Sequence, residues 1–231
     1  MHQIAFLGCG GIATSHAFAL MSLEYYYGNN APKFNKKYIA VRDNKVNIFK
    51  EKFGFQEAIS ADSLFTKNDF DTIFILTPNG SHFEYLIKSI EHKTIKNIYI
   101  EKPVCCSKQE IDILNEAIHN TDKNIQVGFQ FLQMAAIRKA FKIWSSLDFG
   151  ELIHFNVRYL HSDYIDKSYR VKRANRLVEA PIGGALADLG SHGLSILVKF
   201  IGYQLQVKNV LVSGSNGTKL SRIFIESPRL L

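Results

Sequence analysis

Residues 3–13 read Gln-Ile-Ala-Phe-Leu-Gly-Cys-Gly-Gly-Ile-Ala, and this stretch decides the fold. The apolar run at 3–7 predicts a buried strand, and apolar residues at helical spacing over 12–26 predict a helix. Between them, Gly8 to Ala13 fits the pattern G-x-G-x-x-G/A. In such turns the first glycine makes the turn, the second lets a pyrophosphate approach, and the small third residue lets the helix pack on the strand. The stretch therefore predicts a dinucleotide-binding turn.

Short apolar strands and helices continue to alternate after this turn. Strands are expected at 38–41, 72–76, 97–100 and 125–129, and helices at about 44–53, 81–92 and 107–120. The segment 24–37 reads as an insertion before the second strand. Alternation of this kind predicts parallel pairing, and so an α/β fold with a doubly wound Rossmann sheet over residues 1–129.

The pattern changes from residue 130. Helices are expected at 134–147 and 184–201, and strands at 151–160, 206–213 and 221–227, with an irregular charged stretch at 161–182. We expect a second domain over 130–231, a smaller and partial α+β unit with an open sheet. Its helix at 184–201 carries Asp188 and His192 four residues apart, on one helix face. Such a pair suits proton removal from a hydroxyl, although a buried Asp–His hydrogen bond that only fixes the helix is the alternative.

Composition limits the kinds of partner. The formal charge is +7, from 28 Lys+Arg against 21 Asp+Glu, but the basic residues are scattered. Without a binding motif this charge does not predict nucleic-acid binding. Three cysteines, two of them adjacent, fit a reducing cytoplasm, and no Cys/His cluster has metal spacing. No leader or membrane-spanning stretch is recognised.

Three strand ends carry polar or special residues: Gly8 to Gly11, Thr77 to His82, and Glu101 to Pro103. In an open parallel sheet these ends line one crevice. Lys102 there is suited to proton transfer, whereas an ordinary surface Glu-Lys pair is the alternative. The second strand ends in Arg42-Asp43, so a 2′-phosphate and a 2′-hydroxyl ribose both have a partner, and NAD and NADP both remain open.

The ordered set of motifs resembles the Gfo/Idh/MocA family of sugar and polyol dehydrogenases. It consists of GCGGIA, TPNGSH and EKP, then VGFQF at 127–131, FGELIHF at 149–155 and GGALADLGSH at 183–192. The resemblance implies an NAD- or NADP-dependent oxidoreductase that transfers hydride to or from a sugar, polyol or related substrate.

The resemblance also implies roles for particular residues. Lys102, Asp188 and His192 would surround the reacting carbon, with His192 or Lys102 as the general base. Tyr164, Arg173 and Arg176, in the variable region 161–176, would contact the substrate. The candidate cofactor-binding residues are Gly8, Gly10, Gly11, Ile12, Arg42, Asp43, Thr77, Pro78, Asn79, His82, Glu101, Lys102 and Gln130.

Members of the resembled family are longer, and their second domain has a large open sheet that usually forms the subunit interface. Here only about three strand candidates precede Leu231. Assembly into a homo-oligomer is therefore left open. Two alternatives also remain, a non-catalytic dinucleotide-binding paralogue or truncated inactive product, and a methyltransferase with an adenosyl ligand on the glycine turn.

Overall fold

The structure is a computed structural model that describes residues 1–41, 46–146, 154–159, 166–172, 186–203, 206–215 and 218–226. The chain divides into two compact units, Met1–Gly128 and Phe129–Leu231, and each is described by itself. Within the described residues, none of the helices is both long and apolar enough to cross a membrane.

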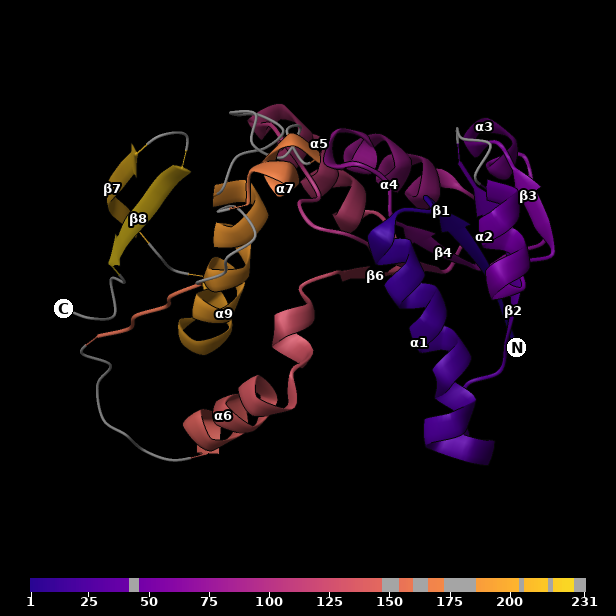
Figure 1. Ribbon diagram of the computed structural model, residues 1–231, viewed down its shortest axis with the longest axis horizontal. Coiled ribbons are helices and arrows are strands. Elements are labelled where there is room, and N and C mark those ends of the chain that lie inside the picture. The colour runs from indigo at the N-terminus through magenta and orange to yellow at the C-terminus, as the bar shows by residue number, and fades with distance from the viewer. Residues whose placement is uncertain are drawn as a thin grey trace. The chain divides into compact units, whose positions relative to one another are not determined.

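The first unit is built on a six-stranded parallel sheet with the order β3-β2-β1-β4-β5-β6 (Figure 1). The expected doubly wound Rossmann sheet is thereby confirmed. The order reverses between β1 and β4, which is the topological switch point of such folds. The strands are β1 (His2–Leu7), β2 (Phe34–Ala40), β3 (Glu57–Ile59), β4 (Thr72–Ile75), β5 (Asn97–Ile100) and β6 (Asn124–Val127).

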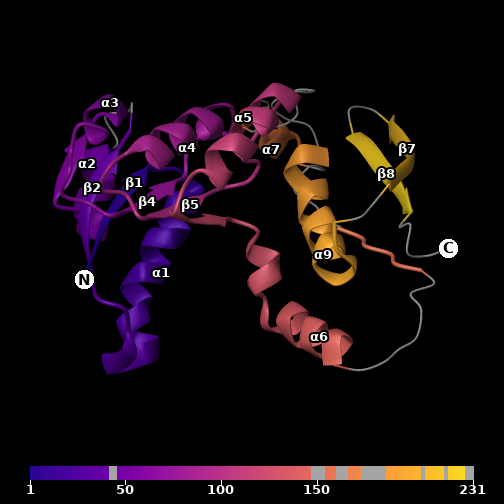
Figure 2. The same ribbon diagram turned by 180° about the vertical axis from the view of Figure 1, so that it is seen from behind.

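Helices cover both faces of this sheet because successive strand residues point to opposite sides. One apolar cluster packs Ala13 and Ala17 of the first helix against Ile4 and Phe6 of β1. The other packs residues such as Leu86 against the opposite face. The helices can be followed in Figures 1 and 2 and are α1 (Gly11–Tyr27), α2 (Val46–Phe53), α3 (Ala61–Leu64), α4 (His82–Glu91) and α5 (Lys108–His119).

The segment at 24–37, interpreted as an insertion, is made largely of regular elements, and its standing as an insertion stays a prediction. The helix α1 runs on to Tyr27, a 3-10 turn, η1, covers Gly28–Asn30, and β2 already begins at Phe34. The polar run Asn35-Lys36-Lys37 gave no apolar signal for the start of this strand, because its residues are only partly buried. Asn35 and Lys36 nevertheless pair with β1, and Lys37 falls at a register shift. The elements β3 and α3 were also not predicted, since three or four residues are too few for a periodic pattern.

The second unit contains helices that meet around Phe200. It comprises η3 (Gln130–Gln133), α6 (Ala135–Ser146), α7 (Lys167–Lys172), a π-helical turn η5 (Leu186–Gly190) and α9 (Ser191–Ile201). The Trp144 indole N–H donates to the carbonyl of Phe200 at 3.1 Å, and the rings of Phe141 and Phe155 lie against the Phe200 ring.

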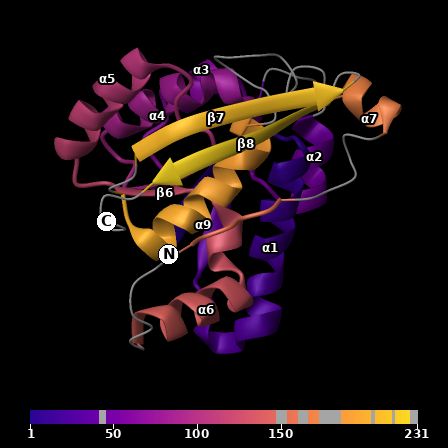
Figure 3. The ribbon, with the colours of Figure 1, turned by 90° about the vertical axis from the view of Figure 1, so that its left-hand side faces the viewer.

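The described residues of this unit also include two strands. They form an antiparallel pair, β7 (Gln206–Ser215) with β8 (Thr218–Glu226), shown in Figure 3. The strand expected at 151–160 is absent from its described part, because residues 154–159 carry no β-ladder. Residues 151–153 and 160 lie outside the described residues. Apolar and polar residues do alternate in this stretch of sequence, but a strand forms only where a second strand pairs with it.

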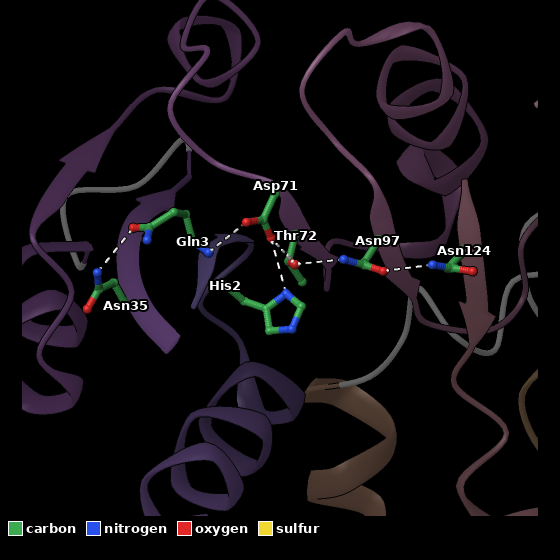
Figure 4. Close-up of polar contacts among 7 residues, drawn as sticks. All are labelled: His2, Gln3, Asn35, Asp71, Thr72, Asn97 and Asn124. Atoms are coloured by element: carbon green, nitrogen blue, oxygen red, sulfur yellow. Dashed lines mark hydrogen bonds and ion pairs between the residues drawn. The ribbon is translucent and has the colours of Figure 1, made fainter. Parts of the chain in front are cut away.

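A line of polar side chains fixes the register of the sheet at its amino edge (Figure 4). Asp71 is central, since its carboxylate accepts from the Gln3 backbone N–H at 3.1 Å and the Thr72 hydroxyl at 2.5 Å. The Asn97 amide donates to Thr72, and the Asn124 amide donates to Asn97. These contacts link β1, β4, β5 and β6 by side chains in addition to their backbone ladders.

We expect Asp71→Ala to lower the free energy of unfolding by about 1–3 kcal/mol, because several donors lose a charged acceptor. Asp112→Ala is the control, since its pairing with Lys108 is a solvent-exposed i,i+4 contact and should cost less than about 0.5 kcal/mol. Urea unfolding measures both. Equal effects of the two substitutions would show that the amino-edge network does not stabilise the sheet.

Candidate functional site

The strands of the first unit leave the sheet at a common carboxyl edge. One further ladder hydrogen bond follows each of four strands, made by the backbone N–H groups of Gly8, Leu76, Glu101 and Gly128 at 2.8–3.1 Å. The glycine turn, the TPNGSH loop, the EKP loop and the start of VGFQF therefore begin side by side. Three of these are the segments that the sequence places around one crevice.

Gly8 is a position at which no side chain fits. Its φ is +117°, and a Cβ there would lie 2.5 Å from the Leu76 carbonyl oxygen and 3.1 Å from the Thr77 nitrogen. Both the left-handed backbone and the close approach require glycine. The end of β1 is thereby held directly against the loop that follows β4.

Gly10 and Gly11 differ from Gly8, because a Cβ at either would have no atom within 4 Å. Gly10 has an ordinary φ of −74° at the N-cap of α1 and is exposed. Neither the packing around Gly10 nor its backbone φ requires glycine there. The bare backbone leaves open space over the first turn of α1, whose N–H groups have no partner within the helix. This arrangement fits a phosphate group, which helix N-termini bind through such N–H groups and the helix dipole.

His82 connects two of the loops from inside the protein. It is 1% exposed, and its Nδ1 lies 2.7 Å from the Pro103 carbonyl oxygen and its Nε2 2.8 Å from the Thr77 carbonyl oxygen. The Lys102–Pro103 peptide between the loops is cis. Any part that His82 has in cofactor binding is therefore indirect, through the positions of the loops that it joins.

Glu101 is a buried carboxylate at the end of β5, 8% exposed. Its Oε1 accepts a hydrogen bond from the Tyr99 hydroxyl at 3.0 Å and lies 3.3 Å from His16 Nε2, on α1. Burial alone would raise the pKa of Glu101, but the contacts with His16 and Tyr99 and the charge of Lys102 outweigh it, and the net pKa is lowered. Burial and the Glu101 charge raise the pKa of Tyr99 in turn.

The Glu101 carboxylate has room because Gly128 carries no side chain. A Cβ at Gly128 would lie 2.6 Å from the Tyr99 hydroxyl and 2.8 Å from Glu101 Oε1. The end of β6 therefore closes against the same pair of side chains. The predicted site residues did not include His16, Tyr99 and Gly128. These three lie far apart in the sequence, and what they share is a contact with Glu101 that only the structure reveals.

In the second unit, Asp188 and His192 are both buried, at 8% and 4% exposure. Asp188 lies in the π-helical turn and His192 in the first turn of α9, and residues four apart lie on nearly the same side in either helix type. Aromatic rings surround His192, with ring centroids 4.6 Å away for Phe131 and 5.8 Å for Tyr159. The stretch that carries Tyr159 comes close to α9 because Gly193 has no side chain, and a Cβ there would lie 3.2 Å from Val157.

The remaining predicted residues fall into three groups. Ile12 and Pro78 are exposed beside the glycine turn and the TPNGSH loop, Asn79 is half-buried, and Gln130 is exposed in η3. Lys102 is half-buried. It belongs to the first unit, whereas Asp188 and His192 belong to the second, so the meeting of these three side chains stays a prediction. Those outside the described residues are Arg42, Asp43, Tyr164, Arg173 and Arg176. In the part of the chain that the structure describes, no three His, Cys, Asp or Glu side chains are placed to hold a metal ion.

Comparison with known proteins agrees with the fold of the first unit. A family model described as "Oxidoreductase family, NAD-binding Rossmann fold" matches residues 2–129. A glucose-6-phosphate 3-dehydrogenase of Bacillus subtilis is 22% identical over 83% of this chain and 51% of its own length. A levoglucosan dehydrogenase of Pseudarthrobacter phenanthrenivorans is 24% identical over 90% of this chain and 53% of its own length.

Solved structures show the same fold. A levoglucosan dehydrogenase in complex with NADH and levoglucosan has a TM-score of 0.79 at 21% identity, covering 93% of this chain and 57% of that one. A scyllo-inositol dehydrogenase of Lactobacillus casei with bound NAD(H) and scyllo-inositol has a TM-score of 0.74 at 18% identity, with 94% and 60% covered. The chain spans about half to three fifths of the length of the relatives it matches.

Gly8 and Gly10 should contribute differently to the stability of the fold. Gly8→Ala should cost at least about 2 kcal/mol of unfolding free energy, from the strained φ and the contact with Leu76. Gly10→Ala meets nothing and should cost less than about 1 kcal/mol, as expected at an N-cap. Thermal and urea unfolding test this, and an equally large loss for Gly10→Ala would contradict it.

Glu101 should stabilise the fold in a pH-dependent way. Because its folded-state pKa lies below the ordinary value of 4.5, its contribution is present above that value and is lost as the pH falls through the folded-state pKa. Glu101→Gln should therefore cost about 1–3 kcal/mol at pH 7. The difference from wild type should shrink in unfolding experiments run at successively lower pH below 4.5. A deficit that stays constant with pH would mean that the charge is not what stabilises.

Proposed function

Because this chain belongs to the Gfo/Idh/MocA family of oxidoreductases, we propose that it binds a nicotinamide dinucleotide and transfers hydride to or from a sugar, polyol or related substrate. The pyrophosphate lies over Gly10 and Gly11 in this proposal. The observation that carries it is the contrast between Gly8, which the fold itself requires, and Gly10 and Gly11, which face open space at a helix N-terminus.

The cofactor and the protein have separate tasks in the proposed reaction. When bound, the nicotinamide supplies or accepts the hydride. The protein has to orient the substrate and move one proton at the reacting hydroxyl. We assign the proton transfer to His192, or to Lys102 in its absence, and give Asp188 the task of orienting the histidine or a substrate hydroxyl.

The choice between NAD and NADP is assigned to Arg42 and Asp43, and the recognition of the substrate to Tyr164, Arg173 and Arg176. The relatives named above are dehydrogenases of glucose 6-phosphate, levoglucosan and scyllo-inositol, and two of the structures contain NADH or NAD(H). A substrate with adjacent hydroxyl groups is consistent with them. We also propose a cytoplasmic location, because three cysteines, two of them adjacent in the sequence, do not form the framework of paired cysteines that is typical of secreted proteins.

The test separates cofactor binding from turnover. Gly10→Val adds a branched side chain over the first turn of α1 and should weaken NAD and NADP binding at least about tenfold while the fold persists. His192→Ala should retain that affinity and lose about 10²–10⁴-fold in turnover of a sugar or polyol that the wild-type protein oxidises or reduces, and Lys102→Ala should lose turnover to a similar extent.

Isothermal titration measures affinity, and nicotinamide absorbance measures turnover. Unchanged affinity in a folded Gly10→Val variant would refute the pyrophosphate site. Retained affinity without turnover on any sugar or polyol would leave a dinucleotide-binding protein, and tight binding of S-adenosylmethionine in place of NAD would indicate the methyltransferase alternative.

A further inference from the structure

If the proposed function holds, two positive charges lie near the end of β5, the Lys102 ammonium group and the oxidised nicotinamide ring. The glycine turn belongs to the half of the sheet formed by β1, β2 and β3, so the nicotinamide half of a dinucleotide belongs beside β4, β5 and β6. Lys102 follows β5 directly. An oxidised nicotinamide ring is cationic and a reduced ring is neutral, so an ammonium group there would favour the reduced cofactor.

Glu101 is the anion at this place. It precedes Lys102, is 8% exposed, and accepts a hydrogen bond from Tyr99 while facing His16 Nε2. A buried carboxylate persists as an anion only where partners of this kind stabilise it. The charge of Lys102 acts on the same carboxyl group and further favours its ionised form.

The carboxylate is also fixed in place. The His16 ring packs edge-on against Tyr99 with centroids 4.6 Å apart, so the imidazole is held on one side. Gly128 also lies against the carboxylate, since a Cβ there would come within 2.8 Å of Glu101 Oε1. A charge held in a buried position is screened by salt much less than a surface charge. Its field therefore persists at the site where a cofactor would bind.

We propose that the Glu101 carboxylate sets the preference of the site between oxidised and reduced cofactor, by offsetting the positive charge that Lys102 and an oxidised nicotinamide bring together. Glu101 is in this view a specificity-determining residue that does not itself exchange a proton or hydride. His16 and Tyr99 are positioning residues that hold it. The inference rests on the proposed function, since it assumes a nicotinamide dinucleotide in the crevice.

The test compares the affinities of purified protein for NAD⁺ and for NADH, measured separately by isothermal titration and by NADH fluorescence. Glu101→Gln keeps the shape and removes the charge. It should weaken NAD⁺ binding about three- to tenfold relative to NADH binding, as expected for one charge acting across a partly polar environment. Glu116→Gln, the same change on an exposed position of α5, is the matched control and should leave the ratio unchanged.

Two further variants separate charge from packing. Glu101→Asp keeps the charge and should keep the wild-type ratio more closely than Glu101→Gln does. Lys102→Met removes the neighbouring cation and should shift the ratio the other way, toward NAD⁺. Because Lys102 is only half-buried, this variant tests the charge balance even if Glu101→Gln does not fold.

The outcomes are distinct. A selective loss of NAD⁺ affinity in Glu101→Gln and a selective gain in Lys102→Met support the proposal. Equal weakening of both cofactors in Glu101→Gln, with no change of ratio in Lys102→Met, overturns it and leaves Glu101 a structural residue, while the proposed function survives. A wild-type protein that binds neither cofactor overturns the proposed function and this inference together.

Discussion

The close approach of Gly8 to Leu76 is the constraint on which the carboxyl edge of the sheet depends. With no side chain at Gly8, the end of β1 lies against the loop after β4, at the point where the strand order reverses. His82 then joins that loop to Pro103, and Glu101 joins the end of β5 to His16 on α1. These contacts join the glycine turn, the TPNGSH loop and the EKP loop at one edge of the sheet.

The two edges of the same sheet are built differently. At the amino edge, a line of hydrogen bonds runs among partly exposed side chains and links neighbouring strands (Figure 4). It consists of Asp71, Thr72, Asn97 and Asn124. The carboxyl edge instead contains buried ionisable groups and glycines that leave space. Buried groups of this kind are costly unless their partners are positioned for them. Their concentration at one edge agrees with a functional role for that edge and a structural role for the other.

Strong local signals were sufficient to predict the fold class and most strands of the first unit. The turn at residues 8–13 and the strands at 72–76 and 97–100 lie where the sequence places them, because an apolar run followed by a turn is a local property. The start of β2 was missed because Asn35, Lys36 and Lys37 are polar. His16 and Gly128 were missed because their importance arises from contacts with Glu101 across about 85 and 27 residues of chain. No periodic pattern carries that information.

If a dinucleotide binds along this carboxyl edge, it should protect the backbone amides there, so the decisive measurement is hydrogen exchange with and without NAD. We expect slower exchange, on cofactor addition, in peptides that cover Gly8 to Ala13, Thr77 to Asn79 and Glu101 to Lys102, all of which follow strand ends. The amino-edge peptides around Asp71 and Asn124 should be unaffected. Protection confined to the amino edge, or absent from the glycine turn, would show that no dinucleotide binds along the carboxyl edge.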